Sequence, residues 1–293
     1  MTALLVGMAL PPTARGRDAK ACEEMCTREF REAETVDNAD DAYRGVLQRL
    51  LSRKESCAGT VIYEARLSIA YSINQDYEHA RQVIEPYRGR REYAAWIDLA
   101  LVYAQHYRGF RTRERVVPLE QALTSFVERH PDVPEAWETL GYVRLLLGRF
   151  DPARVALEAA VAAPLEPERV YRDLTICYVQ TGRYAEGLAA AHKAYRDGDW
   201  ANYPTFTLYT AQALMAYGEL RTAEAILGEM LTQHPELRSD RSVVRVVALL
   251  VEARENAAAR GRGSPAAPPG QLVTPPGPSV PAPRPGGKGP TDP

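Results

Sequence analysis

The residues best suited to covalent chemistry are four cysteines, and three of them lie near the start of the chain. Cys22 and Cys26 are one helical turn apart, and Cys57 opens the next helical region. In an oxidising compartment, Cys22 or Cys26 can form a disulfide with Cys57. In a reducing one, all three would be small apolar residues of a helix pair. No fourth ligand stands at a zinc-like spacing, and Cys177, among apolar helix positions, is expected in the core.

The other titratable side chains form no catalytic or metal-binding set. The five histidines are scattered, and none is paired with another at ligand spacing: they are His79, His106, His130, His192 and His234. Carboxylate pairs such as Glu23-Glu24 are typical of a helix N-terminus or a solvated face. A glycine-rich phosphate loop and a nucleophile elbow are both absent. We therefore expect no enzyme activity, no metal and no cofactor.

Composition and charge exclude further classes. The 36 basic and 38 acidic residues leave a net charge of -2, which disfavours nucleic acid as the main partner. All but four of the basic residues are arginine, which suggests a GC-rich, bacterial coding sequence. No apolar run is long enough to predict a membrane span. Residues 1–17 are either the remnant of a secretory signal or a disordered N-terminus, so export and a cytoplasmic location are both open.

Internal repeats organise the middle of the chain. From Pro134 on, small and aromatic residues recur at the spacing of a two-helix motif of about 34 residues. In the clearest copy they are Trp137, Leu140, Gly141, Gly148, Phe150, Ala153, Leu157 and Ala160. The next copy has Tyr171, Leu174, Thr175, Tyr178, Gly182, Tyr184, Gly187, Ala191 and Ala194 in matching places. This register resembles that of the tetratricopeptide repeat (TPR) family.

Weaker copies extend the resemblance in both directions. A third copy starts at Pro204, two more begin near residues 61 and 93, and a degenerate first unit covers about 18–56. The resemblance implies an all-α fold, an α-α superhelix of about six stacked helix pairs over residues 18–260. Arg144 departs from the family pattern, which usually has tyrosine there, so packing around it is expected to be looser or compensated.

An insertion around Tyr107 to Val117 interrupts the third pair. It carries aromatic and basic residues that either contact an acidic partner or form a solvated surface loop. These residues are Arg108, Phe110, Arg111, Arg113 and Arg115. We expect the second helix of this pair to begin only after the insertion.

The family resemblance also implies a binding surface. In TPR proteins, fixed positions of the first helix of each pair line a concave groove that holds a peptide or a helix. Carried over to this chain, the main groove residues are Ile69, Ile73, Leu101, Glu138, Tyr142, Leu145, Arg172, Ile176, Val179 and Met215. The floor of such a groove would be mainly apolar, so we expect a partner to bind chiefly through apolar contacts.

The C-terminal part predicts a last helix and a tail. Ser239 or Asp240 can cap a helix that runs to about Ala259 and resembles the closing helix of TPR arrays. Its apolar residues wrap more than one face, so it either packs on the last pair and curls into the groove or presents a homodimer face. Residues 261–293 contain eleven prolines and seven glycines, which predicts a disordered tail.

These features predict a protein-protein interaction scaffold or adaptor. Its partner would be a protein or peptide, within an envelope or secretion assembly if the chain is exported. The alternatives are a regulatory or sensor protein whose groove is filled by its own C-terminal helix, and an accessory subunit of an enzyme. The sequence does not identify the partner.

Overall fold

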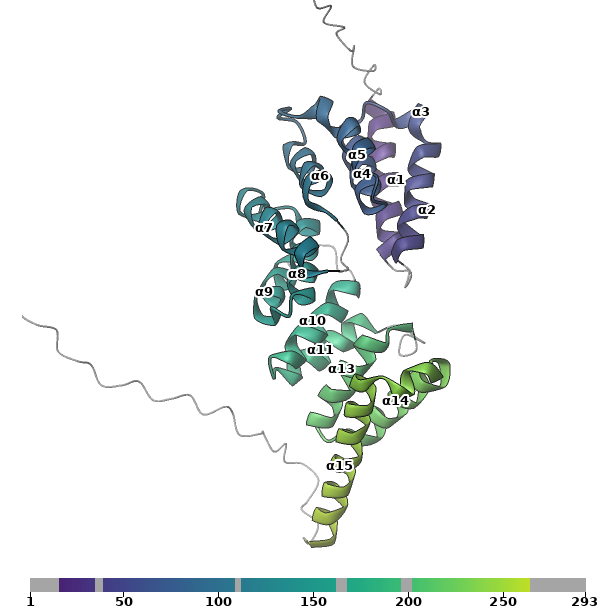
Figure 1. Ribbon diagram of the computed structural model, residues 1–293, viewed down its shortest axis with the longest axis vertical. Helices are drawn as coiled ribbons and strands as arrows, with labels where there is room; N and C mark the ends of the chain where they lie inside the picture. The colour runs from purple at the N-terminus through teal and green to yellow at the C-terminus, as the bar shows by residue number, and fades with distance from the viewer. Residues whose placement is uncertain (1–15, 35–38, 109–111, 162–167, 196–201, 264–293) are drawn as a thin grey trace, which may run out of the picture. The chain divides into compact units, whose positions relative to one another are not determined.

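The computed structural model describes residues 16–34, 39–108, 112–161, 168–195 and 202–263. Within these ranges the chain is all-α and contains no strand (Figure 1). The first helices in chain order are α1 (Gly16–Glu34), α2 (Ala39–Ser52), α3 (Lys54–Cys57), α4 (Val61–Ile73), α5 (Tyr77–Ile84), α6 (Ala94–His106) and α7 (Arg113–Arg129). They are followed by α8 (Pro134–Leu146), α9 (Phe150–Val161), α10 (Glu168–Gln180), α11 (Tyr184–Ala194), α13 (Pro204–Ala216), α14 (Leu220–Gln233) and α15 (Arg241–Gly263). Short 3₁₀ helices, η1 (Glu85–Tyr87) and η2 (Pro235–Ser239), follow α5 and α14.

The helices form antiparallel pairs that contact one another in chain order. The pairs seen among the described residues are α1–α2, α4–α5, α6–α7, α8–α9, α10–α11 and α13–α14, and each pair also packs on the next. One pair alone cannot bury its apolar face, so the stacked neighbours supply the rest of the core. The predicted all-α, helical-repeat fold is thereby confirmed.

The turn inside each pair has one recurring geometry. Gly148, Gly182 and Gly218 all have a positive φ, and no atom lies within 4 Å of a Cβ added to any of them. In each turn the glycine N–H donates to the carbonyl three residues back, and the next N–H donates to the carbonyl five residues before it. This is the hydrogen-bond pattern that ends a helix with a left-handed residue. In the α4–α5 turn, Gln75 adopts the same conformation with a φ of 66°.

Gly141 is required for a different reason, namely close packing of α8 on α9. A Cβ added to this glycine would lie 2.5 Å from Cγ of Leu157. Any larger residue would push the two helices apart, because interiors are packed too tightly to absorb such an overlap. The small residue that the repeat register places here therefore sets the spacing of the pair.

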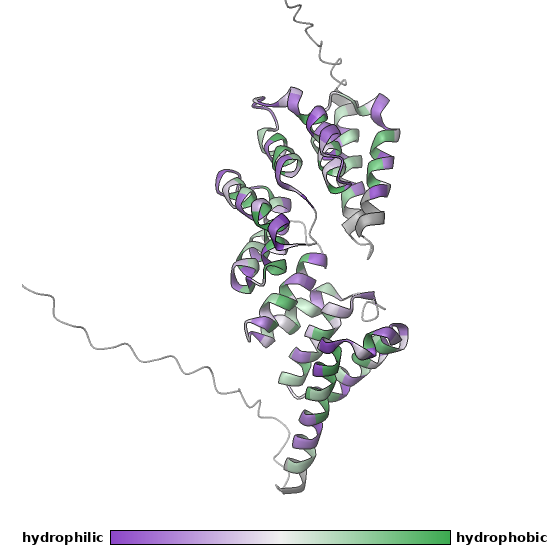
Figure 2. Ribbon diagram, viewed as in Figure 1, coloured by the Kyte–Doolittle hydropathy of each residue, from purple (hydrophilic) through white to green (hydrophobic). Residues whose placement is uncertain are grey.

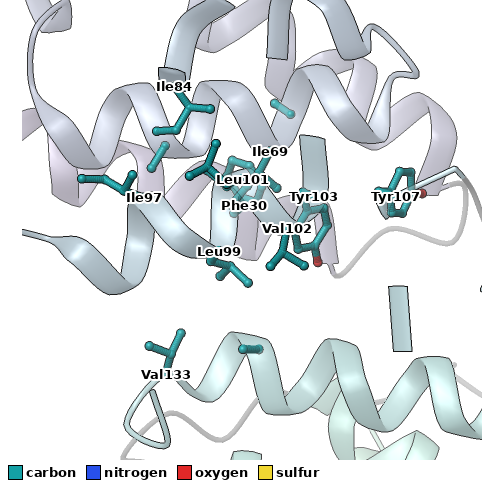
Figure 3. Close-up of a cluster of buried hydrophobic side chains, with 14 of the residues drawn as sticks. Phe30, Ile69, Ile84, Ile97, Leu99, Leu101, Val102, Tyr103, Tyr107 and Val133 are labelled. Carbon is teal, nitrogen blue, oxygen red and sulfur yellow. The ribbon is translucent and has the colours of Figure 1, made fainter. Parts of the chain in front are cut away.

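Buried apolar side chains form three clusters along the array. The first extends from α1 to α9 and includes Phe30, Ile69, Leu101 and Val133 (Figure 3). The second is built from α9, α10, α11 and Phe206 of α13. The third joins α13 and α14 to the start of α15. Cys177 is fully buried in the second cluster, as predicted.

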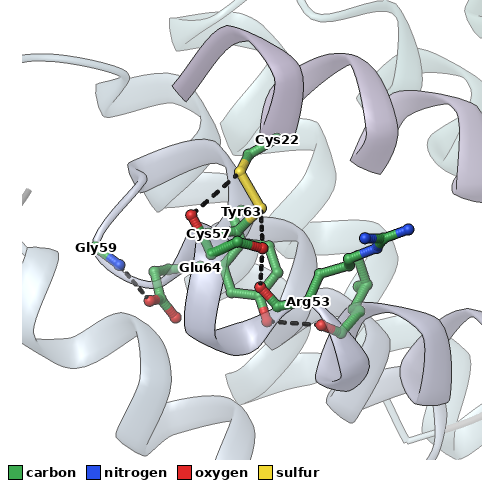
Figure 4. The surroundings of a disulfide bond; sticks show 8 residues. Cys22, Arg53, Cys57, Gly59, Tyr63 and Glu64 are labelled. Carbon is green, nitrogen blue, oxygen red and sulfur yellow. Dashed lines mark hydrogen bonds between the residues drawn. A yellow bond between two sulfur atoms is a disulfide. The ribbon is translucent and has the colours of Figure 1, made fainter. Parts of the chain in front are cut away.

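A disulfide fastens the first pair to the start of the second. Cys22 of α1 is bonded to Cys57 of α3, with 5.7 Å between the Cα atoms (Figure 4). Beside it, the Tyr63 hydroxyl donates a hydrogen bond to the Leu50 carbonyl at 2.8 Å. The structure thus selects Cys22 rather than Cys26 as the partner of Cys57. Cys26 is buried and free, and burial raises the pKa of its thiol to about 12.

Two helix boundaries differ from the sequence-based expectations. Helix α7 begins at Arg113, so Arg113 and Arg115 lie in its first turns rather than in an inserted loop. Pro118 lies in the second turn of this helix, where its missing N–H removes one backbone hydrogen bond, and the helix continues through it. Helix α15 begins at Arg241, with the Asp240 carboxylate accepting from the Ser242 and Val243 N–H groups, and it ends at Gly263 rather than near Ala259.

Compact packing divides the chain into residues 1–253 and 254–293. The expectations for residues 1–15 and 264–293, the N-terminal apolar stretch and the Pro/Gly-rich tail, lie outside the described residues. Among the residues that are described, no helix has the length and apolarity needed to cross a membrane.

Candidate functional site

The ten predicted groove residues all lie on first helices of their pairs, and we call them the first-helix row. Ile69 and Ile73 are on α4, Leu101 is on α6, and Met215 is on α13. Helix α8 carries Glu138, Tyr142 and Leu145, and α10 carries Arg172, Ile176 and Val179. The row therefore follows one helix from each of five successive pairs, as the repeat register predicts.

Burial divides the row into two kinds of residue. Ile69 and Leu101 belong to the first apolar cluster, and Val179 packs closely enough on α11 that its Cγ2 would lie 3.0 Å from a Cβ added to Gly187. These three side chains hold helices together. By contrast, Ile73, Tyr142, Leu145 and Met215 keep part of their surface in solvent. Ile73, Leu145 and Met215 also pack against the apolar clusters with the rest of their surface.

The centre of the row contains a buried group of charges that we call the α8–α10 charge cluster: Glu138, Arg169, Arg172 and Asp173. Glu138, 7% exposed, lies 3.4 Å from the Arg169 Nε. The Arg169 guanidinium also stands over the ring of Tyr142, 5.4 Å from its centroid. One turn further along α10, the Arg172 guanidinium stacks on the Tyr203 ring at 3.8 Å. Two acidic and two basic side chains are thus gathered between α8, α10 and the residue before α13.

Two carboxyl oxygens in this cluster accept no hydrogen bond from the described residues. They are Oε1 of Glu138 and Oδ2 of Asp173. Arg169 attracts Glu138 electrostatically, but the geometry of that contact is not that of a hydrogen bond. Buried carboxylates normally have donors, and a missing one costs roughly 1–3 kcal/mol. Both oxygens are closed to solvent, so the missing donors are a local cost of packing α8 on α10.

The electrostatics follow from this arrangement. The pKa of Asp173 is raised to about 6, chiefly by burial and also by the Glu138 carboxylate, while Arg169 and Arg172 oppose the rise. Burial likewise raises the pKa of Glu138, against the pull of Arg169. The Tyr142 hydroxyl has a raised pKa, mainly through burial and next through the Asp173 charge. Burial is thus the largest influence on the pKa of all three side chains.

At the other end of the row, a second buried charge is fully surrounded by packing. Arg66 of α4 is 5% exposed, and its guanidinium lies between the rings of Phe30, 4.9 Å away, and Trp96, 4.2 Å away. It also pairs with Glu135 of α8 at 3.1 Å. One side chain thus links α1, α4, α6 and α8. Its Nε donates no hydrogen bond within the described chain.

The sequence reading missed Arg66 and Asp173. Both occupy the sixth position of a first helix, between positions that were assigned to the groove. The available signal was a charged residue inside a helix whose neighbours are apolar. Arg144 was noticed, and the structure shows its compensation: its guanidinium lies 3.4 Å from Glu120, and Arg149 holds the same carboxylate at 2.8 Å.

Metal and cofactor chemistry has no obvious place among these residues. Over the part of the chain that the structure describes, no three His, Cys, Asp or Glu side chains are grouped to hold a metal ion. Of the histidines, His79 contacts Asp76 at the start of α5 and His130 contacts Asp98, at 2.8 and 3.1 Å. Both contacts stabilise helix ends or join neighbouring helices.

Comparison with known proteins gives little beyond the fold. No family model matches the chain, and no curated protein matches it by sequence. Among solved structures, it is similar to the crystal structure of PilW, described as a widely conserved type IV pilus biogenesis factor. The two are 16% identical with a TM-score of 0.46, over 70% of this chain and 94% of that one. The fold assignment rests on the helix pairs described above.

Proposed function

We propose that this protein is an interaction scaffold that binds a peptide or an amphipathic helix of a partner protein along the first-helix row. The observation that carries the proposal is the pair of partly exposed side chains Tyr142 and Leu145 on α8, near the centre of the row. A bound segment would place apolar side chains on Tyr142 and Leu145.

Apolar contact supplies the affinity in this proposal. Tyr142 and Leu145 are three residues apart on α8, so their side chains lie on one helix face. We therefore propose that preferred segments carry aliphatic or aromatic anchors at a matching spacing.

We further propose that the scaffold works outside the cytoplasm, in an envelope or secretion assembly. The support is the Cys22–Cys57 disulfide, because such bonds persist mainly in oxidising compartments. The bond also holds α1 against the array, which suits a repeat protein whose first pair has a neighbour on one side only.

The test uses the full chain and a library of displayed random peptides. Peptides that bind are synthesised, and their affinities are measured for Tyr142→Ala and Leu145→Ala. Each change is expected to weaken binding by about 5- to 100-fold, the range for truncation of a central anchor. The controls are Tyr184→Ala for the tyrosine and Val155→Ala for the aliphatic residue. Both Tyr184 and Val155 are exposed and lie on second helices.

Circular dichroism and thermal melting must first show that the variants fold normally. The proposal predicts selected peptides enriched in aliphatic and aromatic residues and unaffected affinities for the two controls. Peptides that bind Tyr142→Ala and Leu145→Ala as tightly as the unchanged protein would place the binding surface elsewhere.

A further inference from the structure

Helix α15 has two apolar faces, and the array covers only one of them. Val243, Val246 and Leu250 are buried in the third cluster, where they pack with α13 and α14. On an adjacent face, Val244 and Val251 are 53% and 50% exposed. Apolar and polar residues are interleaved along the coloured part of this helix (Figure 2). The exposed apolar face is additional to the one that closes the array.

The exposed residues have the spacing of a helix-helix seam. Val244, Ala248 and Val251 follow one another at intervals of four and three residues, which places them in a line along the helix. The buried Val246 lies on the far side of this line, so packing on the array leaves the seam accessible. Ala248, at its centre, is small enough for another helix to approach closely.

Charges beside the seam indicate what covers it. Arg245 and Glu252 are both exposed, are seven residues apart, and lie on the same flank of the line. No ion pair or hydrogen bond to either side chain is seen within the described chain. If a second copy of α15 runs antiparallel across the first with Ala248 at the crossing, Arg245 faces Glu252 of the other copy. The same operation places Val244 against Val251.

Two-fold symmetry makes this match self-consistent. In a two-fold contact, each pair of facing residues occurs twice, once in each direction. One crossing point therefore yields two Arg245–Glu252 pairs and two Val244–Val251 contacts. In a parallel arrangement, the flank that carries Arg245 and Glu252 would face the opposite flank of the other copy, so these two side chains would not meet. We propose that the exposed face of α15 is a homodimer contact in which two copies of this helix pack antiparallel about Ala248.

Charge reversal tests the proposal on the full chain. Sedimentation equilibrium should show a concentration-dependent dimer at micromolar to sub-millimolar protein. Arg245→Glu and Glu252→Arg each place like charges at both pairs and should weaken dimerisation at least tenfold. A mixture of the two variants restores opposite charges and should recover a heterodimer, and the combined R245E/E252R chain should recover the homodimer.

The control is Arg221→Glu, which makes the same charge change at an exposed position of α14 and should leave association unchanged. Helix content is measured for every variant, and all the altered side chains are exposed. A chain that stays monomeric over the whole range overturns the proposal. So does a dimer that both single reversals leave intact, or a mixture of the two variants that fails to associate.

Discussion

The N-terminal end and the centre of the first-helix row bury charge in different ways. At the N-terminal end, Arg66 contacts two aromatic rings and is paired with Glu135, although its Nε donates no hydrogen bond. At the α8–α10 charge cluster, Glu138 and Asp173 are equally buried, and one oxygen of each lacks a donor. Burying a charge is costly unless its surroundings compensate it. The two rings and Glu135 compensate Arg66, whereas burial still raises the pKa of Glu138 and Asp173 despite the attraction of nearby arginines.

This contrast separates a structural role from a binding role on one surface. Arg66 joins four helices, and the neighbouring disulfide fixes α1, which carries Phe30. That region is tied together before any partner arrives. The α8–α10 cluster lies beside the partly exposed Tyr142, over which Arg169 stands. We expect changes in the first region to cost stability and changes in the second to alter binding and the pH dependence of folding.

The largest expected loss of stability follows removal of the disulfide. The bond closes a loop of 35 residues, and the chain-entropy model gives about 4 kcal/mol for such a loop. The variant Cys22→Ala/Cys57→Ala should unfold at a correspondingly lower denaturant concentration. Cys177→Ala controls for losing a buried sulfur without losing a cross-link.

The same bond can be checked in material from the native host by peptide mapping without reduction. A Cys22–Cys57 peptide is expected. Free thiols at both positions, or a double variant no less stable than Cys177→Ala, would contradict the view that the N-terminal region is held by this cross-link.

A smaller loss is expected on changing Arg66. Arg66→Ala removes the cation between Phe30 and Trp96 and leaves Glu135 without its partner. Breaking a buried ion pair typically costs 3–5 kcal/mol, and because Glu135 is partly exposed we expect about 3 kcal/mol. Urea unfolding gives the value. Arg88→Ala breaks a surface pair with Glu85 and should cost less than about 1 kcal/mol.

If both arginine variants lose the same stability, Arg66 is no more important than a surface charge. Peptide binding should survive in Arg66→Ala at temperatures where it remains folded. If Arg66→Ala loses binding but not stability, the binding surface includes α4, and Arg66 has a binding role rather than a structural one.

The repeat pattern located the helices well because local rules place them. Gly148, Gly182 and Gly218 mark turns that need a left-handed residue, and Gly141 marks a close approach of two backbones. Such requirements recur at fixed spacing and can be read from one sequence. The predicted start of α7 was too late, because the insertion was interpreted as a loop. In the structure, the residues of the insertion after Thr112 form the first turns of α7.

The surroundings of the candidate site could not be read in this way. Whether Arg66 is buried depends on rings from α1 and α6, which are 36 and 30 residues away along the chain. The family positions named Glu138 and Arg172 but not Asp173, whose burial depends on how α10 packs on its neighbours. Long-range packing, rather than local pattern, determined which groove positions became core.

The smallest and most specific effect concerns pH and Asp173. Its pKa is about 6 in the folded chain, against 3.8 for the unperturbed group, chiefly because burial disfavours the carboxylate. The folded state therefore holds this proton more tightly than the unfolded state. The contribution of Asp173 to the free energy of unfolding is therefore fully present below about pH 4 and is lost as the pH rises through 6.

Each pKa unit corresponds to about 1.4 kcal/mol, so this group should lower stability by roughly 2–3 kcal/mol between pH 4 and pH 7. Asp173→Asn cannot ionise and should flatten that part of the curve, which makes the variant more stable than the unchanged chain near pH 7. Urea unfolding at pH 4, 5, 6 and 7 measures the slope, with the exposed Asp132→Asn as control. Because Glu138 also has a raised pKa, some slope of the same sign should remain in Asp173→Asn. An unchanged slope in Asp173→Asn would mean that Asp173 is as well compensated as Arg66, and the contrast between the two regions would fail.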